Sequence, residues 1–408
     1  YGEVNTPFSL VIKMLDSFKK EDFRDKNKKW LDPGCGNGNF SIVLYYKLLN
    51  NLNKIPDIEE RKNHIIKNMI FLNEINIDKI KIITKIFGNE VNIINKNYLD
   101  ISYNFQFDYI IGNPPFNNFG IIKVPSNKNI SKKNDGNTIW PEFIKKNISL
   151  LKENGKMCVF IPSIWLKPDK SNIYNLLLKF YITNLNCYSN TETNKLFKGQ
   201  AQTPCCFFLL TKIDNPGYLN IFDKELNKII KFTFINQMPI PLCNSSLINH
   251  ILSKNYPSLN IIKTNLPSKK IKLSNEESSL HNYKNIKTRL AANKELIIEY
   301  SDQPLIGYNK SKIILANKMI GLPYLDLIGE YGISNRDNYI IYMDDQEDLK
   351  KIYKFLSTDF IQKIYKSTRY RMMFLEKYAF SFIPNITKIK DFPLDINNES
   401  VEKFFNTN

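Results

Sequence analysis

The stretch "WLDPGCGNGNF", residues 30–40, follows a short apolar run with an acid and then with glycines at 34, 36 and 38. Glycines let the backbone turn tightly and approach a ligand closely. Such a turn between a strand and a helix is typical of the ligand-binding edge of a doubly wound parallel sheet. The dinucleotide-binding fingerprint would have a further glycine where Asn39 stands and no acid before the turn. Asp32 instead favours a ligand that carries a cationic group.

The pattern around this stretch alternates short apolar runs with helical segments from Trp30 to about Thr211, which predicts a mostly parallel sheet with crossover helices. We expect strands at 29–32, 69–74, 91–95, 107–112, 156–161 and 205–211, and helices at 9–18, 38–50, 58–68, 78–87, 139–152 and 171–181. The alternation ends at "DNPG", residues 214–217. We therefore predict an α/β domain over 1–215 and a second, α+β domain over 216–408, with one long or two consecutive helices within 344–378.

The composition of the chain gives weaker evidence about function than the motif at 30–40 does. The formal charge of +17 favours a polyanionic partner, because Lys and Arg neutralise phosphates, although the many Lys, Asn and Ile residues are also typical of an AT-rich genome. The six cysteines form no C-x-x-C pair and the three histidines are scattered, so we expect no metal site and no histidine-based triad. The sequence shows neither a membrane-length apolar run nor a signal-peptide pattern. We expect a cytoplasmic protein, associated with the nucleoid if the source is bacterial.

Acidic side chains at strand ends suggest the cofactor. S-Adenosylmethionine (AdoMet) carries a methionine ammonium for Asp32 and a ribose diol for a second carboxylate at the end of the next strand. Glu74 in "MIFLNEIN", residues 69–76, is placed for the diol, and Ile75 is placed to pack on the adenine. The following strand end, "NIINKNYLD" at 92–100, offers Asn97 and Tyr98 as neighbours of the adenine, with Asp100 as the alternative acid.

The stretch "DYIIGNPPFNNFG", residues 108–120, ends an apolar run with an amide and two prolines. Proline fixes φ and donates no backbone hydrogen bond, so Asn113, Pro114 and Pro115 should be held rigidly. An exocyclic aromatic amine is a poor nucleophile, and two acceptors on its N–H groups, the Asn113 side-chain oxygen and the Pro114 carbonyl, would draw its lone pair back onto nitrogen. Phe116 would stack on the target ring, a contact worth roughly 1–3 kcal/mol. The polar segment 117–138 predicts a loop that closes over the substrate.

These motifs together resemble the gamma-class AdoMet-dependent DNA adenine methyltransferases of restriction-modification systems. The matching stretches are, in order, "GEVNTPFSLVIKMLD" (2–16), "LDPGCGNGNF" (31–40), "NEIN" (73–76), "NKNYLD" (95–100), "GNPPF" (112–116), "FIKKNISLLKENGKMCVFIPSIWL" (143–166) and "LFKGQAQTPCCFFLL" (196–210). This order is typical of the gamma class, and the resemblance covers residues 1 to 212. It implies a Rossmann-like methyltransferase sheet followed by a target-recognition domain.

The resemblance also implies residue roles. The cofactor contacts would be Thr6 and Pro7 at the methionine carboxylate, Asp32, Gly34 and Gly36 at the methionine moiety, Glu74 at the ribose and Asn97 at the adenine amine. Asn113 to Phe116 would be catalytic, and Phe197 would be a second aromatic against a flipped base. The family usually has aspartate where Asn97 stands, but an amide oxygen can still accept from an adenine amine. The gap from Asp32 to Glu74 is long and holds an extra helical insert around 51–68.

Double-stranded DNA is the implied partner, and a target base must be extruded from the duplex at a cost of a few kcal/mol. Arg336 in "GISNRDN" (332–338), and Arg369 and Arg371 in "KSTRYRMM" (366–373), are candidates for groove and phosphate contacts, because arginine reads guanine edges. A solvated helix face is the alternative for the last two. The sequence shows no nuclease cluster, so a nuclease partner would be a separate chain or segment.

Two further hypotheses compete with DNA methylation. One is the methylation of another planar amine, in RNA adenine or in a protein glutamine. Phe116 in place of the tyrosine usual in glutamine-modifying relatives, and the large basic second domain, favour DNA. The other is a catalytically silent DNA-binding subunit, against which the intact Asp32, Glu74 and N-P-P-F turn argue.

Overall fold

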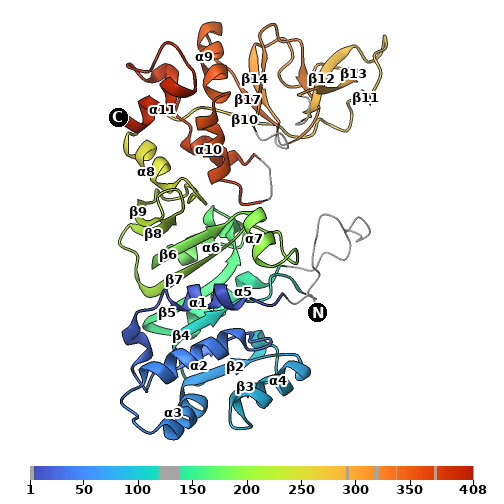
Figure 1. Cartoon of the computed structure of the whole chain (residues 1–408). Coiled ribbons are helices and arrows are strands. Elements are labelled where there is room, and N and C mark those ends of the chain that lie inside the picture. Colours follow the sequence, from blue (N-terminus) through green and yellow to red (C-terminus); the bar gives the residue numbers. More distant parts are fainter. Residues whose placement is uncertain are drawn as a thin grey trace. The chain divides into compact units, whose positions relative to one another are not determined.

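The structure is a computed structural model that describes residues 4–118, 138–290, 294–316, 321–336, 338–371 and 375–407 (Figure 1). The chain forms two compact units, residues 1–235 and 236–408. Most of the predicted loop at 117–138 lies outside the described residues. Among the described residues, no helix has the length and apolar character that crossing a bilayer requires.

The first unit is built on one sheet. Its strands are β1 (Trp30–Asp32), β2 (Ile70–Asn73), β3 (Asn92–Ile94), β4 (Phe107–Gly112), β5 (Leu151–Pro162), β6 (Phe180–Tyr188), β7 (Cys205–Asp214), β8 (Tyr218–Asp223) and β9 (Lys228–Thr233). Within the described residues they form a nine-stranded sheet in the order β3-β2-β1-β4-β5-β7-β6-β8-β9. Strands β1 to β5 pair in parallel, and β7 lies antiparallel between β5 and β6. The strand order reverses between β1 and β4, and ligands of doubly wound sheets bind outside the carboxyl ends of strands at such a point. The predicted Rossmann-like methyltransferase sheet is thereby confirmed.

Two features of this sheet differ from the prediction. Residues 180–188, expected in part as the end of a helix, form β6, because they pair with β7 in a register that sets Cys187 opposite Cys206. Strand β8 then pairs in parallel with β6, Leu185 opposite Ile221, and β9 completes an antiparallel hairpin with β8. The compact unit therefore ends at Ile235 and not at 215.

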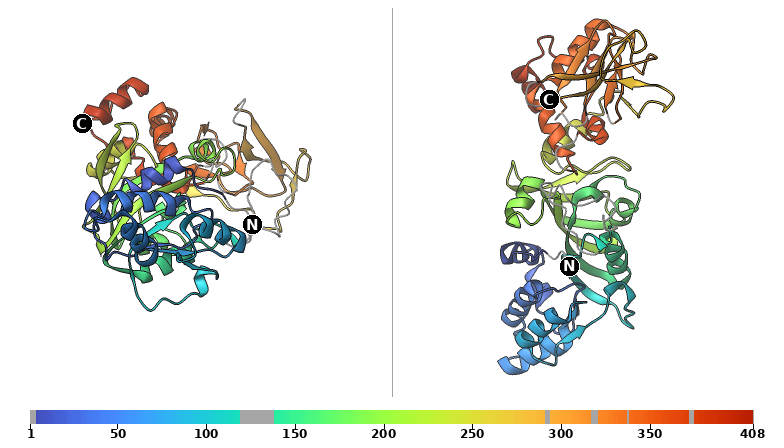
Figure 2. Two further views of the ribbon diagram at one scale, coloured as in Figure 1. Left: turned by 60° about the horizontal axis from the view of Figure 1, so that its bottom comes forward. Right: turned by 90° about the vertical axis from the view of Figure 1, so that its right-hand side faces the viewer.

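The helices of the first unit are α1 (Phe8–Leu15), α2 (Asn39–Asn51), α3 (Ile58–His64), α4 (Ile77–Phe87), α5 (Trp140–Leu150), α6 (Ile173–Leu177) and α7 (Asn190–Leu196). Buried residues of α1, α2 and α4 share one core with β1, β2, β4 and β5. Figure 2 shows α5 and α6 on the opposite side of the sheet.

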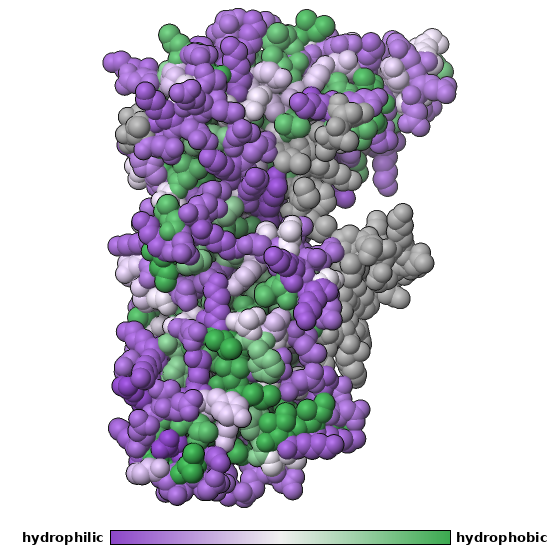
Figure 3. Space-filling view, in the orientation of Figure 1, coloured by the Kyte–Doolittle hydropathy of each residue, from purple (hydrophilic) through white to green (hydrophobic). Residues whose placement is uncertain are grey.

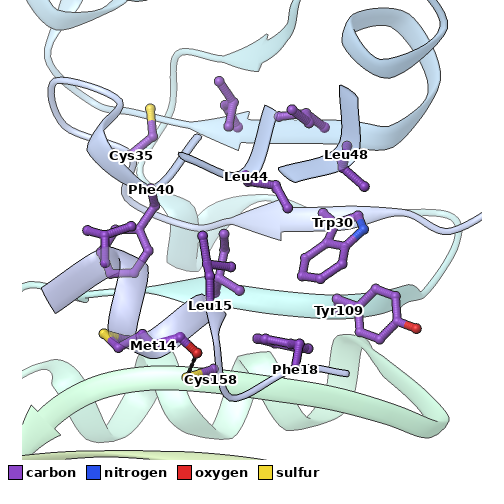
Figure 4. Close-up of a cluster of buried hydrophobic side chains, with 14 of the residues drawn as sticks. Met14, Leu15, Phe18, Trp30, Cys35, Phe40, Leu44, Leu48, Tyr109 and Cys158 are labelled. Carbon is purple, nitrogen blue, oxygen red and sulfur yellow. Dashed lines mark hydrogen bonds between the residues drawn. The ribbon is translucent and has the colours of Figure 1, made fainter. Parts of the chain in front are cut away.

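This core fixes the start of the chain on the sheet. Met14 and Leu15 of α1, and Phe18 shortly after it, lie in one core with Trp30 of β1 and Tyr109 of β4, and Phe18 is the one beside the two rings (Figure 4). Trp30 is fully buried, its ring 4.2 Å from that of Tyr109 between centroids, and the Cys158 thiol lies 3.6 Å from the Met14 carbonyl. Because α1 is held in this way, the residues just before it are carried to the carboxyl ends of the central strands.

The described part of the second unit contains two four-stranded sheets. One has the order β10-β17-β14-β15, from Ile262–Lys263, Tyr339–Ile341, Lys312–Leu315 and Pro323–Asp326. The other has the order β11-β13-β12-β16, from Leu273–Ser274, Leu296–Ser301, Tyr283–Arg289 and Gly332–Ile333. Its helices are α8 (Ser245–Ser253), α9 (Gln346–Leu356), α10 (Asp359–Ser367) and α11 (Asn398–Thr407). Helices α9 and α10 confirm the predicted pair of consecutive helices. The presence of both sheets and helices confirms that the second unit is α+β.

A buried ion pair holds the turn between β15 and β16. The Lys312 ammonium lies 2.5 Å from the Asp326 carboxylate, with side-chain exposures of 0% and 2%. Asp326 also accepts backbone N–H groups from Gly329, Glu330 and Tyr331. These hydrogen bonds compensate the removal of the carboxylate from water.

Candidate functional site

The glycine turn after β1 surrounds a buried carboxylate. Asp32 is 2% exposed, and it accepts weak hydrogen bonds from the Gly34 N–H and the Ser41 hydroxyl, both at 3.4 Å. Burial raises the pKa of Asp32 to about 7; the Gly34 hydrogen bond opposes that rise, and the negative charge of Glu74 adds to it. A cationic ligand beside this carboxyl group would stabilise its ionised form and lower its pKa. The residue thus fits the role predicted for it.

Gly112 explains how β4 reaches this turn. It has φ +153°, and a Cβ atom on it would lie 3.2 Å from Asp32 Oδ1 and 3.4 Å from Pro33 Cδ. Only glycine leaves that space open, so the end of β4 passes directly against the Asp32 turn. Gly112 belongs to the predicted motif "GNPPF" (112–116), but it was not predicted to be a site residue. A glycine between an apolar strand and N-P-P was the available signal.

Glu74, at the end of β2, ties the glycine turn to the next crossover. Its Oε2 accepts the Gly36 N–H and its Oε1 accepts the Asn76 N–H, both at 2.9 Å. Each carboxylate oxygen keeps a further lone pair for a ligand hydroxyl. Ile75 beside it is 54% exposed, and Figure 3 shows apolar side chains gathered on the surface over α4. Both residues have the exposure that their predicted contacts require.

Asn113 lies where β4 ends, and its two amide atoms have different surroundings. Nδ2 donates a hydrogen bond to Thr6 Oγ1 at 3.0 Å. Oδ1 is buried, and it has no hydrogen-bond partner among the residues that the structure describes. Pro114 is buried and Pro115 is exposed. A buried acceptor without a donor is rare in folded proteins and indicates a place for a missing donor.

The segment before α1 joins three motifs. Thr6 is 6% exposed, and its backbone carbonyl accepts a hydrogen bond from Asn39 Nδ2 at 2.7 Å. Asn37 of the glycine turn also donates to Asn5 Oδ1, at 2.9 Å. The structure therefore brings the Thr6 segment, the glycine turn and Asn113 together. The two asparagines of the glycine turn were not predicted as site residues. Pro7, the N-cap of α1, follows Thr6 directly.

The two predicted aromatic residues differ in exposure. Phe116 is half-buried and packs at the margin of the core of the first unit. Phe197 is 4% exposed and belongs to that core, with its ring 5.5 Å from the Phe160 ring between centroids. Phe116 thus offers surface to a ligand, whereas Phe197 has its ring covered by neighbouring side chains.

The two residues predicted beside the adenine, Asn97 and Tyr98, differ in exposure and in their hydrogen-bond partners. Asn97 is exposed and caps the short helix η3 (Tyr98–Asp100): its Oδ1 accepts the Leu99 N–H at 3.3 Å and its Nδ2 donates to Asp100 at 2.9 Å. Tyr98 is 2% exposed, and its hydroxyl donates to Asn147 of α5 at 2.7 Å. The Tyr98 side chain therefore anchors η3 on α5 and offers little surface to a cofactor.

The three arginines lie in the second unit. Arg336 is exposed, in a loop held by a hydrogen bond from the Thr264 hydroxyl to the Asn335 carbonyl at 2.8 Å. Arg371 is also exposed, while residues 372 and 373 of the same motif lie outside the described residues. Arg369 is half-buried, which lowers its pKa, and its Nη2 has no hydrogen-bond partner in the described part of the chain. Arg369 therefore does not lie on a solvated helix face, which was the alternative to a DNA contact for this residue.

Comparisons with known proteins match the part of the chain that contains these residues. Residues 6–197 match the model of the family "Eco57I restriction-modification methylase", a range that runs from Thr6 to Phe197 and includes every predicted cofactor and catalytic residue. The type II methyltransferase M.AccI of Acinetobacter calcoaceticus is 31% identical over 124 residues, which are 27% of this chain and 22% of that protein. The chain thus spans about a fifth of the length of this curated relative.

Solved structures give weaker likenesses. The type IIL restriction-modification enzyme MmeI, in complex with DNA, has a TM-score of 0.48 at 14% identity and covers 92% of this chain and 65% of its own. A type I restriction-modification methyltransferase subunit from Streptococcus thermophilus has a TM-score of 0.35 at 18% identity, over 56% of this chain and 50% of its own. These TM-scores are low, and the likeness to restriction-modification methylases rests on the sequence matches.

Proposed function

We propose that this chain, whose residues 6–197 match the model of the Eco57I restriction-modification methylase family, transfers a methyl group from AdoMet to DNA, and specifically to the exocyclic amine of adenine flipped out of a duplex. The observation that carries the proposal is the buried, unpartnered Oδ1 of Asn113, in the N-P-P-F turn beside Asp32. Such an acceptor suits a planar amine, which brings N–H donors.

The residues of the glycine turn fit the proposed cofactor. Asp32 would pair with the methionine ammonium, and the Gly34 and Gly36 backbones allow close approach. Glu74 keeps acceptor capacity for the ribose diol, and the exposed Ile75 and Asn97 side chains are available to the adenine. AdoMet supplies a methyl group that is already activated on a sulfonium.

The N-P-P-F turn then has two tasks. Asn113 Oδ1 and the Pro114 carbonyl would accept the two N–H groups of the amine and return the lone pair to its nitrogen. As the nitrogen–methyl bond forms, the methyl–sulfur bond would break to leave a neutral thioether, and the methylated amine would release one proton. Phe116 stacks on the base and keeps amine, methyl and sulfur aligned, with water excluded. Phe197 serves as the second aromatic surface, which requires its covered ring to become accessible when the base enters.

The second unit, with its exposed Arg336 and Arg371, is proposed as the target-recognition domain for double-stranded DNA. Contacts to phosphate and base edges would offset the few kcal/mol that base extrusion costs. Replacement of either arginine by alanine should weaken DNA binding without a change in AdoMet affinity, measured by fluorescence anisotropy and calorimetry.

The test of the function is transfer of labelled methyl from AdoMet to unmethylated duplex DNA, RNA and protein in parallel. The wild type should label DNA adenine, and Asn113→Ala should not. Asn27→Ala is the matched control, because Asn27 is an exposed asparagine away from the site. Label in RNA or protein would refute the substrate, and AdoMet binding without any transfer would favour a silent subunit.

A further inference from the structure

The hydrogen bond between Thr6 and Asn113 gives the N-terminal segment a second task. We propose that Thr6 is a positioning residue, whose hydroxyl holds the Asn113 amide with its oxygen towards the target amine. This inference rests on the proposed methyl transfer and adds to it the element that orients the amide.

An asparagine amide has two orientations of nearly equal shape, related by a half turn. Only one is useful here, because Oδ1 accepts from an amine whereas Nδ2 would set donors against donors. In the structure Nδ2 is held by Thr6 Oγ1 at 3.0 Å, and Oδ1 takes the buried, unpartnered place. A hydroxyl can accept or donate, so Thr6 could bond either amide atom. The observed orientation leaves one buried carbonyl oxygen open, whereas the flipped one would leave the buried NH2 group without a partner, which folded proteins tolerate less, so the bond to Thr6 favours the useful orientation.

The backbone of Thr6 is itself held in place from two sides. Asn39 of the glycine turn donates to the Thr6 carbonyl, and Asn37 donates to Asn5 one residue earlier. On the other side Leu10 and Val11 of α1 are buried in the core. The orientation of the Asn113 amide is thereby linked to the cofactor turn and not to the N-P-P-F turn alone.

This role differs from the cofactor contact that the family resemblance implies for Thr6. A residue that touches the methionine carboxylate affects AdoMet affinity, whereas a residue that orients Asn113 affects the chemical step. Thr6→Val keeps the shape of the side chain and removes the hydroxyl, and Thr6→Ser keeps the hydroxyl. These two variants separate the roles.

The experiment measures kcat and KM for AdoMet and for duplex DNA, together with the AdoMet dissociation constant, for the wild type and both variants. Rates are normalised to the concentration of AdoMet-binding sites, so that misfolded protein does not count. We expect Thr6→Val to lower kcat by roughly tenfold, which corresponds to about 1.4 kcal/mol and to the upper range for one hydrogen bond. AdoMet affinity should change less than threefold, and Thr6→Ser should restore kcat.

Two results would overturn the inference: weaker AdoMet binding by Thr6→Val at an unchanged kcat, or a kcat that Thr6→Ser does not restore. Amide hydrogen exchange of the Asn113 side chain, followed by NMR, gives a readout without turnover. Exchange should be slow in the wild type and faster in Thr6→Val, and equal rates would refute the hydrogen bond. A wild type that methylates no DNA would refute the proposed function, while these exchange rates would still decide whether Thr6 holds the amide.

Discussion

Replacement of Asp32 by asparagine should stabilise the first unit and impair its function. The wild-type side chain is 2% exposed, and burial moves its pKa from 3.8 to about 7. At pH values above 7 this difference corresponds to about 4 kcal/mol that the folded state spends on an ionised, buried carboxylate. Asparagine has no charge to bury, but it loses one of the two acceptor contacts, to Gly34 or to Ser41, which costs about 1–2 kcal/mol.

The pH dependence has a definite sign. Between pH 3.8 and about 7 the folded wild type holds a proton that the unfolded chain has released, so its stability falls as the pH rises through this window. The advantage of Asp32→Asn should therefore be about 2–3 kcal/mol larger at pH 8 than at pH 5. AdoMet binding by the variant should be about 10–100-fold weaker, because a hydrogen bond to a charged group is lost.

Tryptophan fluorescence during urea unfolding is a suitable assay. The three tryptophans, Trp30, Trp140 and Trp165, all lie buried in the first unit, so their emission reports that unit and not the second. Unfolding curves at pH 5 and pH 8 give the stability difference at each pH. A difference that does not change with pH would refute the argument that burial of Asp32 raises its pKa.

Three further predictions concern neighbouring features. AdoMet affinity should fall about tenfold per pH unit below pH 7, because the ammonium requires an ionised Asp32; calorimetry between pH 5.5 and 8 tests this, and a flat profile would contradict it. Gly112→Ala should lower the free energy of unfolding by about 1–3 kcal/mol, because residue 112 has a φ of +153° and a Cβ there would lie 3.2 Å from Asp32 Oδ1. Gly34→Ala should lower it less in the same urea assay, because a Cβ at residue 34 would have no neighbour within 4 Å. Lys312→Met should destabilise the second unit by about 3–5 kcal/mol, because Asp326 is left buried without its partner. Hydrogen exchange should show this loss in the second unit alone, and equal protection in variant and wild type would refute it.

The sequence predicted the parts of the fold that depend on local pattern. Strands β1 to β5 and β7 lie where the apolar runs placed them, because each run is bounded by turn residues or by a helical period. Strand β6 was not predicted, and its first two residues were assigned to a helix, because a short apolar segment after a helix does not reveal its period. Its identity depends on pairing with β7, which is a tertiary interaction.

The residues of the candidate site also divide into those that a local pattern predicts and those that depend on tertiary contacts. Asp32, Glu74 and Asn113 were identifiable because each follows a strand at the binding edge of the sheet. The hydrogen bond from Asn113 to Thr6 joins residues 107 positions apart, and a single sequence carries no signal for it. Tyr98 was expected at the cofactor because it follows the end of a predicted strand, but its side chain is anchored on Asn147 of α5, a contact that no local pattern reveals.

The β8–β9 hairpin has a practical consequence for anyone who wishes to express the first unit alone. A fragment cut at 215 would lose Leu219, Ile221 and Phe232, each at most 1% exposed, and would open the backbone edge of β6. Open strand edges recruit other chains, so such a fragment should aggregate. A fragment that runs to Ile235 keeps that edge covered and ends the sheet at β9, where the exposed Lys228 and Lys231 discourage a further strand from pairing.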